Sequence, residues 1–95
     1  MRKSMLDILA CPIDKHYPLE LEEFKTVEDS NINEVLIQEG MLSCPSCNRF
    51  FPIMDEIPIL LPDELRDKQK DIEFLKIWRE KIPEKIIKHG NPWHL

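Results

Sequence analysis

The spacing of apolar residues changes once along the chain, close to Pro62. Before that point, short apolar runs lie among charged residues, a pattern typical of half-buried β-strands. After it, apolar residues recur mainly every three or four positions, which indicates an amphipathic helix. The residues of this stripe are Leu65, Ile72, Leu75, Trp78 and Ile82. The sequence therefore predicts an antiparallel sheet followed by a helical segment.

Turn and proline signals divide the chain into short elements. A short N-terminal helix is expected over 4–9, with Ser4 as its N-cap and Pro12 after its end. Asp63 is expected to cap a helix over 64–81, and Pro83 to open a second helix over 84–89. Strands are expected over 17–27, 35–38, 41–43, 50–54 and 57–61, with turns at 28–34, 39–40 and 55–56. The expected fold class is α+β, with three to four antiparallel strands.

The length of 95 residues suits one small domain. We expect a single domain over 1–95, with a sheet core over 1–62 and a helical C-terminal segment over 63–95. Near the end of the chain, Trp93 either docks back onto the sheet or contacts a partner. Docking back is favoured, because tryptophan is highly buried on average.

The apolar run from Ile57 to Leu61 contains Pro58, which cannot donate a hydrogen bond to a neighbouring strand. This segment is therefore expected at the edge of the sheet. A long apolar edge without charge needs a cover. Two interpretations are open, namely a helix of the same chain lying over it or a partner protein that adds a strand to it.

A Cys-x-x-Cys pair, Cys44 and Cys47, has the spacing at which a tight turn directs two sulfurs toward one metal ion. The third cysteine, Cys11, begins a similar stretch in which Asp14 stands where a second pair would have its cysteine. A tetrahedral zinc ion needs four ligands, so Asp14 or His16 would complete the set. The alternatives are small buried residues that hold no metal, and a disulfide from Cys11 to the Cys44–Cys47 pair.

The formal net charge of −5 is unevenly distributed, with eleven acidic and five basic residues before residue 62 and seven acidic and eight basic residues after it. Such a chain has no basic surface for binding nucleic acid by itself. The sequence has neither an apolar stretch of bilayer length nor a signal-peptide core, and its odd number of cysteines does not suggest a disulfide framework. We therefore expect a cytoplasmic protein without a membrane segment.

No catalytic constellation is evident. The Cys44–Cys47 pair also matches a thiol redox site, which needs a cysteine at a helix N-terminus, but the residues that follow it are typical of a strand. The three histidines, His16, His89 and His94, lie in different expected elements. The sequence therefore predicts a protein that is not an enzyme.

The combination of Cys11-Pro12, Cys44-Pro45-Ser46-Cys47, Phe51-Pro52-Ile53 and the run from Asp55 to Pro62 resembles a known family. This family comprises the small zinc-ribbon-like activator subunits of tRNA, rRNA and release-factor methyltransferases, and the likeness covers about residues 4–65. Without a helical insertion, the chain is most similar to an archaeal member. One departure is Asp14, because fully ligated members have cysteine there.

The resemblance implies a non-catalytic subunit that forms a heterodimer with S-adenosylmethionine-dependent, class I methyltransferases by edge-strand augmentation. Nucleic acid would be contacted only through the partner. The resemblance also implies partner-binding residues in and before the apolar edge. They are Phe50, Phe51, Met54, Ile57, Pro58, Ile59, Leu60 and Leu61. A stand-alone zinc-ribbon-like module and a thiol redox protein are the alternatives.

Overall fold

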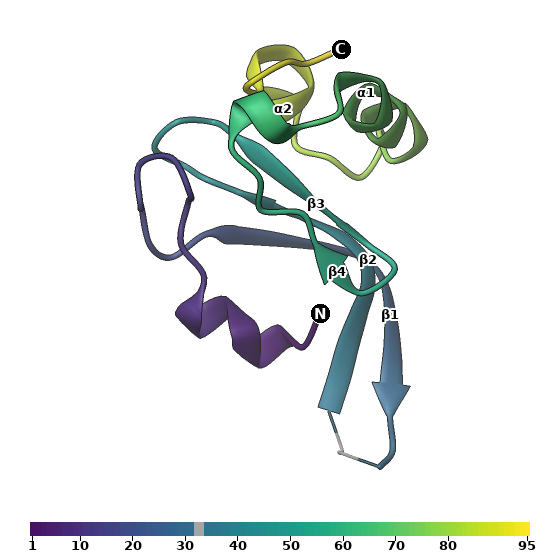
Figure 1. The fold of residues 1–95 in the computed structure, drawn as a ribbon. Helices are drawn as coiled ribbons and strands as arrows, with labels where there is room; N and C mark the ends of the chain where they lie inside the picture. The colour runs from purple at the N-terminus through teal and green to yellow at the C-terminus, as the bar shows by residue number, and fades with distance from the viewer. Residues whose placement is uncertain (32–33) are drawn as a thin grey trace.

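The computed structural model describes residues 1–31 and 34–95 and confirms the expected α+β class (Figure 1). Four antiparallel strands form one sheet in the order β1-β2-β3-β4. A 3-10 helix, η1, precedes the sheet, and a short 3-10 helix and two α-helices follow it. The bounds are η1 Lys3–Ile8, β1 Glu20–Asp29, β2 Glu34–Ser43, β3 Phe50–Met54, β4 Ile57–Pro58, η2 Asp63–Leu65, α1 Lys68–Ile77 and α2 Glu84–His89.

The two faces of the sheet are covered by different ends of the chain (Figure 1). Neighbouring residues of a strand point to opposite faces, and the pairs Met41–Leu42 and Phe50–Phe51 divide accordingly. We call the two resulting groups of buried residues the first and the second core. The first core consists of Met1, Cys11, Leu19, Ile37, Leu42, Cys44, Phe51 and Ile53. The second core consists of Phe24, Met41, Phe50, Phe74, Leu75, Ile82, Ile86 and Ile87.

The turn expected at 39–40 is wrong, because β2 continues through Gly40. The register of β1 against β2 shifts on both sides of Lys25, so the ribbon carries a bulge there. A Cβ atom on Gly40 would lie 2.6 Å from the carbonyl oxygen of Glu22. Glycine therefore serves close approach of two strands at this position, and not a turn. Of the turn expected at 28–34, Ile32 and Asn33 lie outside the described residues.

The expected cap residues of two helices also differ from the structure. The N-terminal helix is a 3-10 helix that begins at Lys3, with Arg2 and not Ser4 at the N-cap position. Asp63 does not cap the long helix, because both of its carboxylate oxygens accept hydrogen bonds from Arg49, at 2.9 and 2.8 Å. Helix α1 begins four residues later instead, where the side chain of Asp67 accepts a hydrogen bond from the backbone of Lys70.

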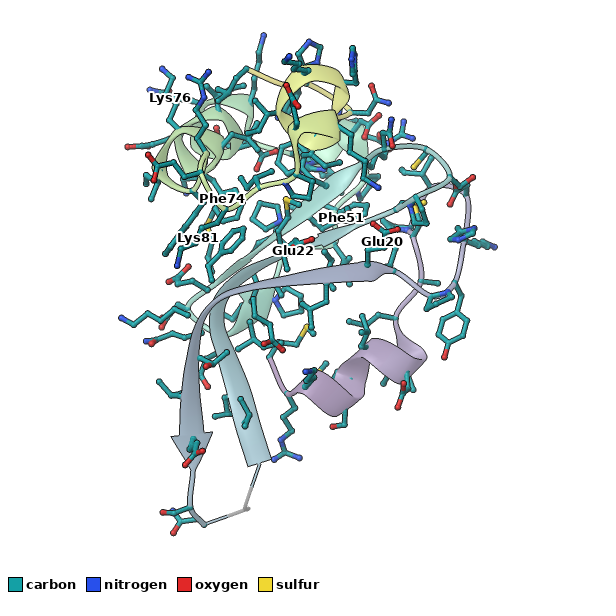
Figure 2. The ribbon with its side chains drawn as sticks, turned by 180° about the vertical axis from the view of Figure 1, so that it is seen from behind. Glu20, Glu22, Phe51, Phe74, Lys76 and Lys81 are labelled. Atoms are coloured by element: carbon teal, nitrogen blue, oxygen red, sulfur yellow. The ribbon has the colours of Figure 1, made fainter. Side chains whose placement is uncertain are left out.

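The C-terminal segment, residues 63–95, covers the second core, and we call this segment the cap. Figure 2 shows Phe74 directed from α1 toward the sheet, while Lys76 points away from it. Phe24 of β1 stacks on Trp78, with ring centroids 4.9 Å apart. Trp93 docks back as expected, and its indole nitrogen donates to Asp71 Oδ2 at 3.1 Å. Among the described residues, no helix is long and apolar enough to cross a membrane.

Candidate functional site

The four candidate metal ligands lie on two loops with the same backbone pattern. In the first loop, the backbone N–H of Lys15 donates to the carbonyl of Cys11, and the N–H of Cys11 donates to the carbonyl of His16. The second loop repeats both bonds, from Asn48 to Cys44 and from Cys44 to Arg49. The fifth residue of each loop has a positive φ, 60° at Lys15 and 57° at Asn48. The first loop has therefore kept the fold of a Cys-x-x-Cys turn although its second cysteine position holds aspartate.

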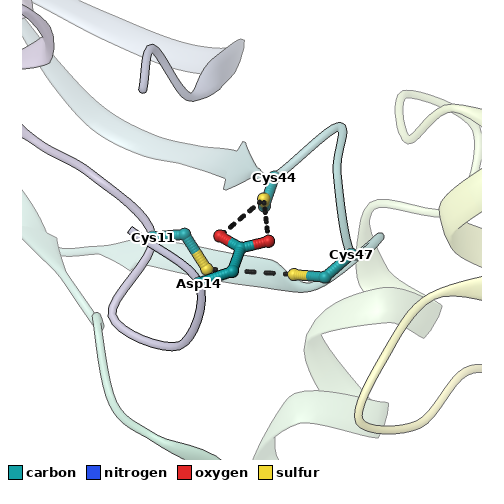
Figure 3. Close-up of side chains that lie close together, drawn as sticks. All are labelled: Cys11, Asp14, Cys44 and Cys47. Carbon is teal, nitrogen blue, oxygen red and sulfur yellow. Dashed lines mark hydrogen bonds between the residues drawn. The ribbon is translucent and has the colours of Figure 1, made fainter. Parts of the chain in front are cut away.

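These loops bring Cys11, Asp14, Cys44 and Cys47 together, so that one ligand atom from each lies within 4.8 Å of the others (Figure 3). The sulfurs of Cys11 and Cys47 are 3.8 Å apart, and that of Cys44 lies 3.5 Å from both carboxylate oxygens of Asp14. Usual zinc bond lengths in a tetrahedral site place two sulfurs about 3.8 Å apart, and a sulfur and a carboxylate oxygen about 3.6 Å apart. The donor set and the distances within these two pairs of ligands therefore fit a four-coordinate zinc ion.

His16 contributes differently from its expected role as an alternative fourth ligand. Its backbone N–H donates to Asp14 Oδ1 at 3.0 Å, whereas its ring does not belong to the cluster that the described residues form. The bond orients the carboxylate toward Cys44. All three cysteines are free thiols, and a separation of 3.8 Å between Cys11 and Cys47 is well beyond a disulfide bond of about 2.05 Å.

The electrostatics of the cluster differ between its oxygen and its sulfur ligands. The hydrogen bond from the His16 backbone lowers the pKa of Asp14 to about 2, so the carboxylate is ready to bind a cation. Burial raises the pKa of Cys44 to about 12 and also raises the pKa of Cys11. Without metal these two thiols hold their protons at neutral pH, and a metal ion would displace them on binding. A raised thiol pKa is the opposite of what thiol redox catalysis requires.

The predicted edge strand is the outer strand of the sheet, although regular pairing covers only Ile57 and Pro58. The N–H of Ile59 donates to the carbonyl of Pro52 at 2.8 Å, so the backbone groups of Ile57 and Ile59 face β3. Those of Pro58 and Leu60 consequently face outward. Proline stands at a position where no donor toward β3 is needed, which explains why the sheet accepts it here.

The predicted partner-binding residues differ in exposure. Ile57 is 59% exposed and Leu61 is 37% exposed, whereas Pro58, Ile59 and Leu60 are half-buried. Phe50 and Phe51 are fully buried, one in each core, so neither ring reaches the surface. Met54 is half-buried and packs against the second core. The helices of the cap contribute to the second core, and Leu60 of the edge packs against the first.

Beside this edge lies a cleft of about 580 Å³ that was not predicted from the sequence. It opens between η1, the outer half of β2 and the turn before β4. Its lining residues are Met1, Arg2, Ser4, Met5, Ile8, Leu36 and Glu56. Backbone hydrogen bonds in both directions between Met1 and Ile37 hold the start of the chain there. Periodicity could not reveal this long-range pairing.

We call the two cysteine-containing loops, residues 11–16 and 44–49, the knuckles. A small antiparallel sheet with two such knuckles defines a zinc-ribbon-like protein. The model of the family "Trm112p-like protein" matches residues 2–56, and the chain belongs to this family. Two curated relatives are the UPF0434 proteins of Dechloromonas aromatica and Nitrosococcus oceani. The first is 39% identical over 71 residues, 75% of this chain and 97% of the relative, and the second is 32% identical over 74 residues, 78% of this chain and 100% of the relative.

A solved structure is also similar to this chain. It is the complex between the Haloferax volcanii Trm112 methyltransferase activator and a candidate methyltransferase. The matching chain is 39% identical, and the two superpose with a TM-score of 0.57. The match spans 70% of this chain and 100% of the other. The family model ends at residue 56, so the second-core residues that come from the C-terminal helices lie outside the part of the chain that it matches.

Proposed function

We propose that this chain is a non-catalytic subunit that binds, stabilises and activates S-adenosylmethionine-dependent class I methyltransferases. The observation that carries the proposal is its 39% identity to a chain of the solved complex between a methyltransferase activator and a candidate methyltransferase. Membership of the Trm112p-like family supports the same role. From the family resemblance we further propose that the partners methylate tRNA, rRNA or a release factor.

The geometry of the metal centre supports a structural and not a catalytic role. Cys11, Asp14, Cys44 and Cys47 would supply all four ligands of a tetrahedral zinc ion. Such a set leaves no open position for water or substrate, which is the arrangement of structural zinc sites. A bound ion would cross-link the loop after η1 to the loop before β3. The protein would thus hold its sheet in place for a partner.

The outer edge of β4 supports binding by strand addition. The outward backbone groups are the carbonyl of Pro58 and the N–H and carbonyl of Leu60, and an added strand can pair with them. Ile57 and Ile59, the neighbours of Pro58 in the sequence, point to the same face of the strand, and a partner would bury both side chains. In this proposal Phe50 and Phe51 act from inside, by anchoring β3 in both cores, and Met54, Pro58, Leu60 and Leu61 complete the contact region.

The cleft beside η1 extends this proposed surface. Glu56 belongs to the cleft and directly precedes Ile57 of β4. Ile8, another lining residue, is 77% exposed. An apolar side chain of the methyltransferase can enter the cleft while its backbone pairs with β4. A large exposed apolar side chain next to an open edge is typical of interaction surfaces.

The charge distribution supports indirect contact with nucleic acid. Eleven of the sixteen charged residues before residue 62 are acidic, which disfavours direct binding to phosphates. The methyltransferase would therefore bind the RNA. We place the complex in the cytoplasm, because buried free thiols and a zinc-thiolate site suit a reducing compartment.

The test is co-purification of the tagged protein with a methyltransferase from its own source, using Ile57→Asp and the matched control Ile77→Asp. Both side chains are exposed, at 59% and 67%, but Ile77 lies on α1. Ile57→Asp is expected to weaken binding about 100-fold, since it replaces about 2–3 kcal/mol of apolar burial by a charge. Ile77→Asp should bind normally. Equal binding by both variants would rule out the β4 edge as the contact.

A second measurement separates the function from the contact strand. Methyl transfer by the captured enzyme should fall when this subunit is removed and return when it is added back. If no methyltransferase is captured by the wild-type protein, the activator role itself is wrong, whatever the variants do.

A further inference from the structure

The C-terminal tail lies against the loop that carries Cys44 and Cys47. The backbone N–H of Asn91 donates to the carbonyl of Asn48 at 2.9 Å, and its carbonyl accepts from Phe50 at 3.3 Å. Its side-chain amide donates to the carbonyl of Cys47 at 2.8 Å. One residue near the end of the chain thus makes three hydrogen bonds to a four-residue stretch that begins at a candidate metal ligand.

Asn91 is itself held from both sides. Before it, Gly90 ends α2 so tightly that a Cβ atom there would lie 2.5 Å from the carbonyl oxygen of Ile86. After it, the indole of Trp93 donates to Asp71, which pairs with the buried guanidinium of Arg66. The tail therefore has a defined position over the knuckle and does not merely lie near it.

The two knuckles differ in this support. Both knuckles have the same pair of internal backbone hydrogen bonds. Only the knuckle that contains Cys44 and Cys47 is also bonded to Asn91. Arg49, the residue after Asn48, is also fixed by its paired hydrogen bonds to Asp63. These supports come from residues 63–95, which lie outside the stretch that the family model matches. Groups behind the ligands commonly tune a metal site by orienting them.

We propose that Asn91 is a positioning residue for the metal centre, which holds the Cys44–Cys47 knuckle in its ligand geometry through the amide bond to Cys47. The ligand set has three thiols and one exposed carboxylate, so less of its affinity comes from thiolates than in a four-cysteine site. Prior ordering of the knuckle then contributes more to metal binding. The C-terminal segment would serve the metal centre as well as the second core.

The test compares Asn91→Ala and Asn91→Asp with the residue-matched control Asn31→Ala, in the turn after β1. Asn91→Asp keeps the shape of the side chain but replaces its donor by a carboxylate that repels the Cys47 carbonyl. Zn²⁺ affinity, measured by competition with a chromogenic chelator, should fall about 10-fold in both Asn91 variants. The control should bind Zn²⁺ as the wild type does.

A second readout uses the metal-free protein and decides the question even if Zn²⁺ binds weakly. Amide hydrogen exchange at Asn48, whose N–H bonds to Cys44, should become about fivefold faster in both Asn91 variants. Exchange at Ile37 in β2 should stay unchanged, which separates loosening of the knuckle from general destabilisation. Unchanged exchange at Asn48, or normal behaviour of Asn91→Asp alone, would overturn the proposal. Neither variant alters β4, so methyltransferase capture is an independent outcome.

Discussion

The two faces of the sheet are built on different principles. The first core closes within the first 60 residues and contains two of the three cysteines, Cys11 and Cys44, fully buried. The second core contains three sheet residues, and its other five come from the C-terminal cap. The first face thus combines apolar packing with a cluster of metal-ligating side chains, whereas the second face depends on packing and hydrogen bonds. Apolar packing therefore stabilises both faces, whereas the metal-ligating side chains belong to the first face alone.

Deletion of residues 63–95 should have the largest effect. It would expose Phe24, Met41 and Phe50 and remove five buried apolar residues, each contributing about 1.5–3 kcal/mol. The summed loss is comparable to the whole stability of a typical domain, about 5–15 kcal/mol, so the fragment 1–62 should aggregate or unfold. Circular dichroism and size-exclusion chromatography measure the outcome. A folded, monomeric 1–62 fragment would instead show two independent units and contradict the prediction of one domain.

Two arginine–aspartate pairs sharpen the comparison, one within the cap and one that joins the cap to Arg49. The Arg66–Asp71 side chains are 1% and 7% exposed, while those of Arg49 and Asp63 are 20% and 36% exposed. Asp71→Ala leaves a buried guanidinium unpaired and should cost about 3–5 kcal/mol in unfolding free energy.

Its matched control, Asp63→Ala, should cost less than about 1 kcal/mol, because solvent screens that pair. Chemical denaturation measures both values. The double change Arg66→Met with Asp71→Leu should restore most of the loss. If the double variant stays as unstable as Asp71→Ala, the loss of stability does not come from the unpaired charge of Arg66 alone.

Zinc should act mainly on the loops that carry its ligands and on Asn91, which is bonded to one of them. Adding Zn²⁺ at about 100 times its dissociation constant should stabilise the fold by about 2.7 kcal/mol, and Cys44→Ser should abolish this gain. Hydrogen exchange should slow at the amides of Cys11 and Cys44, while that of Leu75 in α1 follows global unfolding alone. Selective slowing at Leu75 would show that the two faces are coupled.

The smallest effect concerns pH. Hydrogen bonds from Arg49 lower the pKa of Asp63, so this carboxylate contributes stability above the ordinary aspartate pKa that is lost as the pH falls. Burial raises the pKa of Asp71, so its contribution has the opposite sign and declines as the pH rises through that raised value.

Unfolding free energies between pH 3 and pH 6 test this pair of signs. Asp63→Asn should flatten the loss of stability toward acid pH, and Asp71→Asn should make that loss steeper. The same slope for both variants would show that neither carboxylate is linked to folding as described.

Much of the local structure could be predicted from sequence. The strand 50–54, the turn at 55–56 and the helix 84–89 lie where their residue patterns placed them. These elements depend on neighbours within a few positions, such as Pro58 at an edge or Gly90 after a helix. The cysteines Cys11, Cys44 and Cys47 could likewise be named as candidate ligands from their spacing, whereas Asp14 and His16 both stayed candidates for the fourth position.

Contacts between distant residues were decided only by the tertiary structure. Gly40 has the sequence signal of a turn but lies within a strand, because its lack of a side chain admits the Glu22 carbonyl. Asp63 has the signal of a helix cap but is bound by Arg49. Asn91 carries no signal of its own, and it reaches Cys47 only after the cap has folded across the sheet.

The sequence by itself thus determined the candidate metal ligands, where the open edge begins and where the last helix lies, whereas the helix expected over 64–81 covers only Lys68–Ile77. The tertiary structure determined that Phe50 and Phe51 face opposite cores, and it selected Asp14 over the ring of His16 as the fourth member of the cluster. The physical reason is that periodicity and turn preferences act over a few residues. The hydrogen-bond partner of a side chain is decided by how distant segments pack together, and these can be more than 40 residues apart, as for the amide of Asn91 and the carbonyl of Cys47.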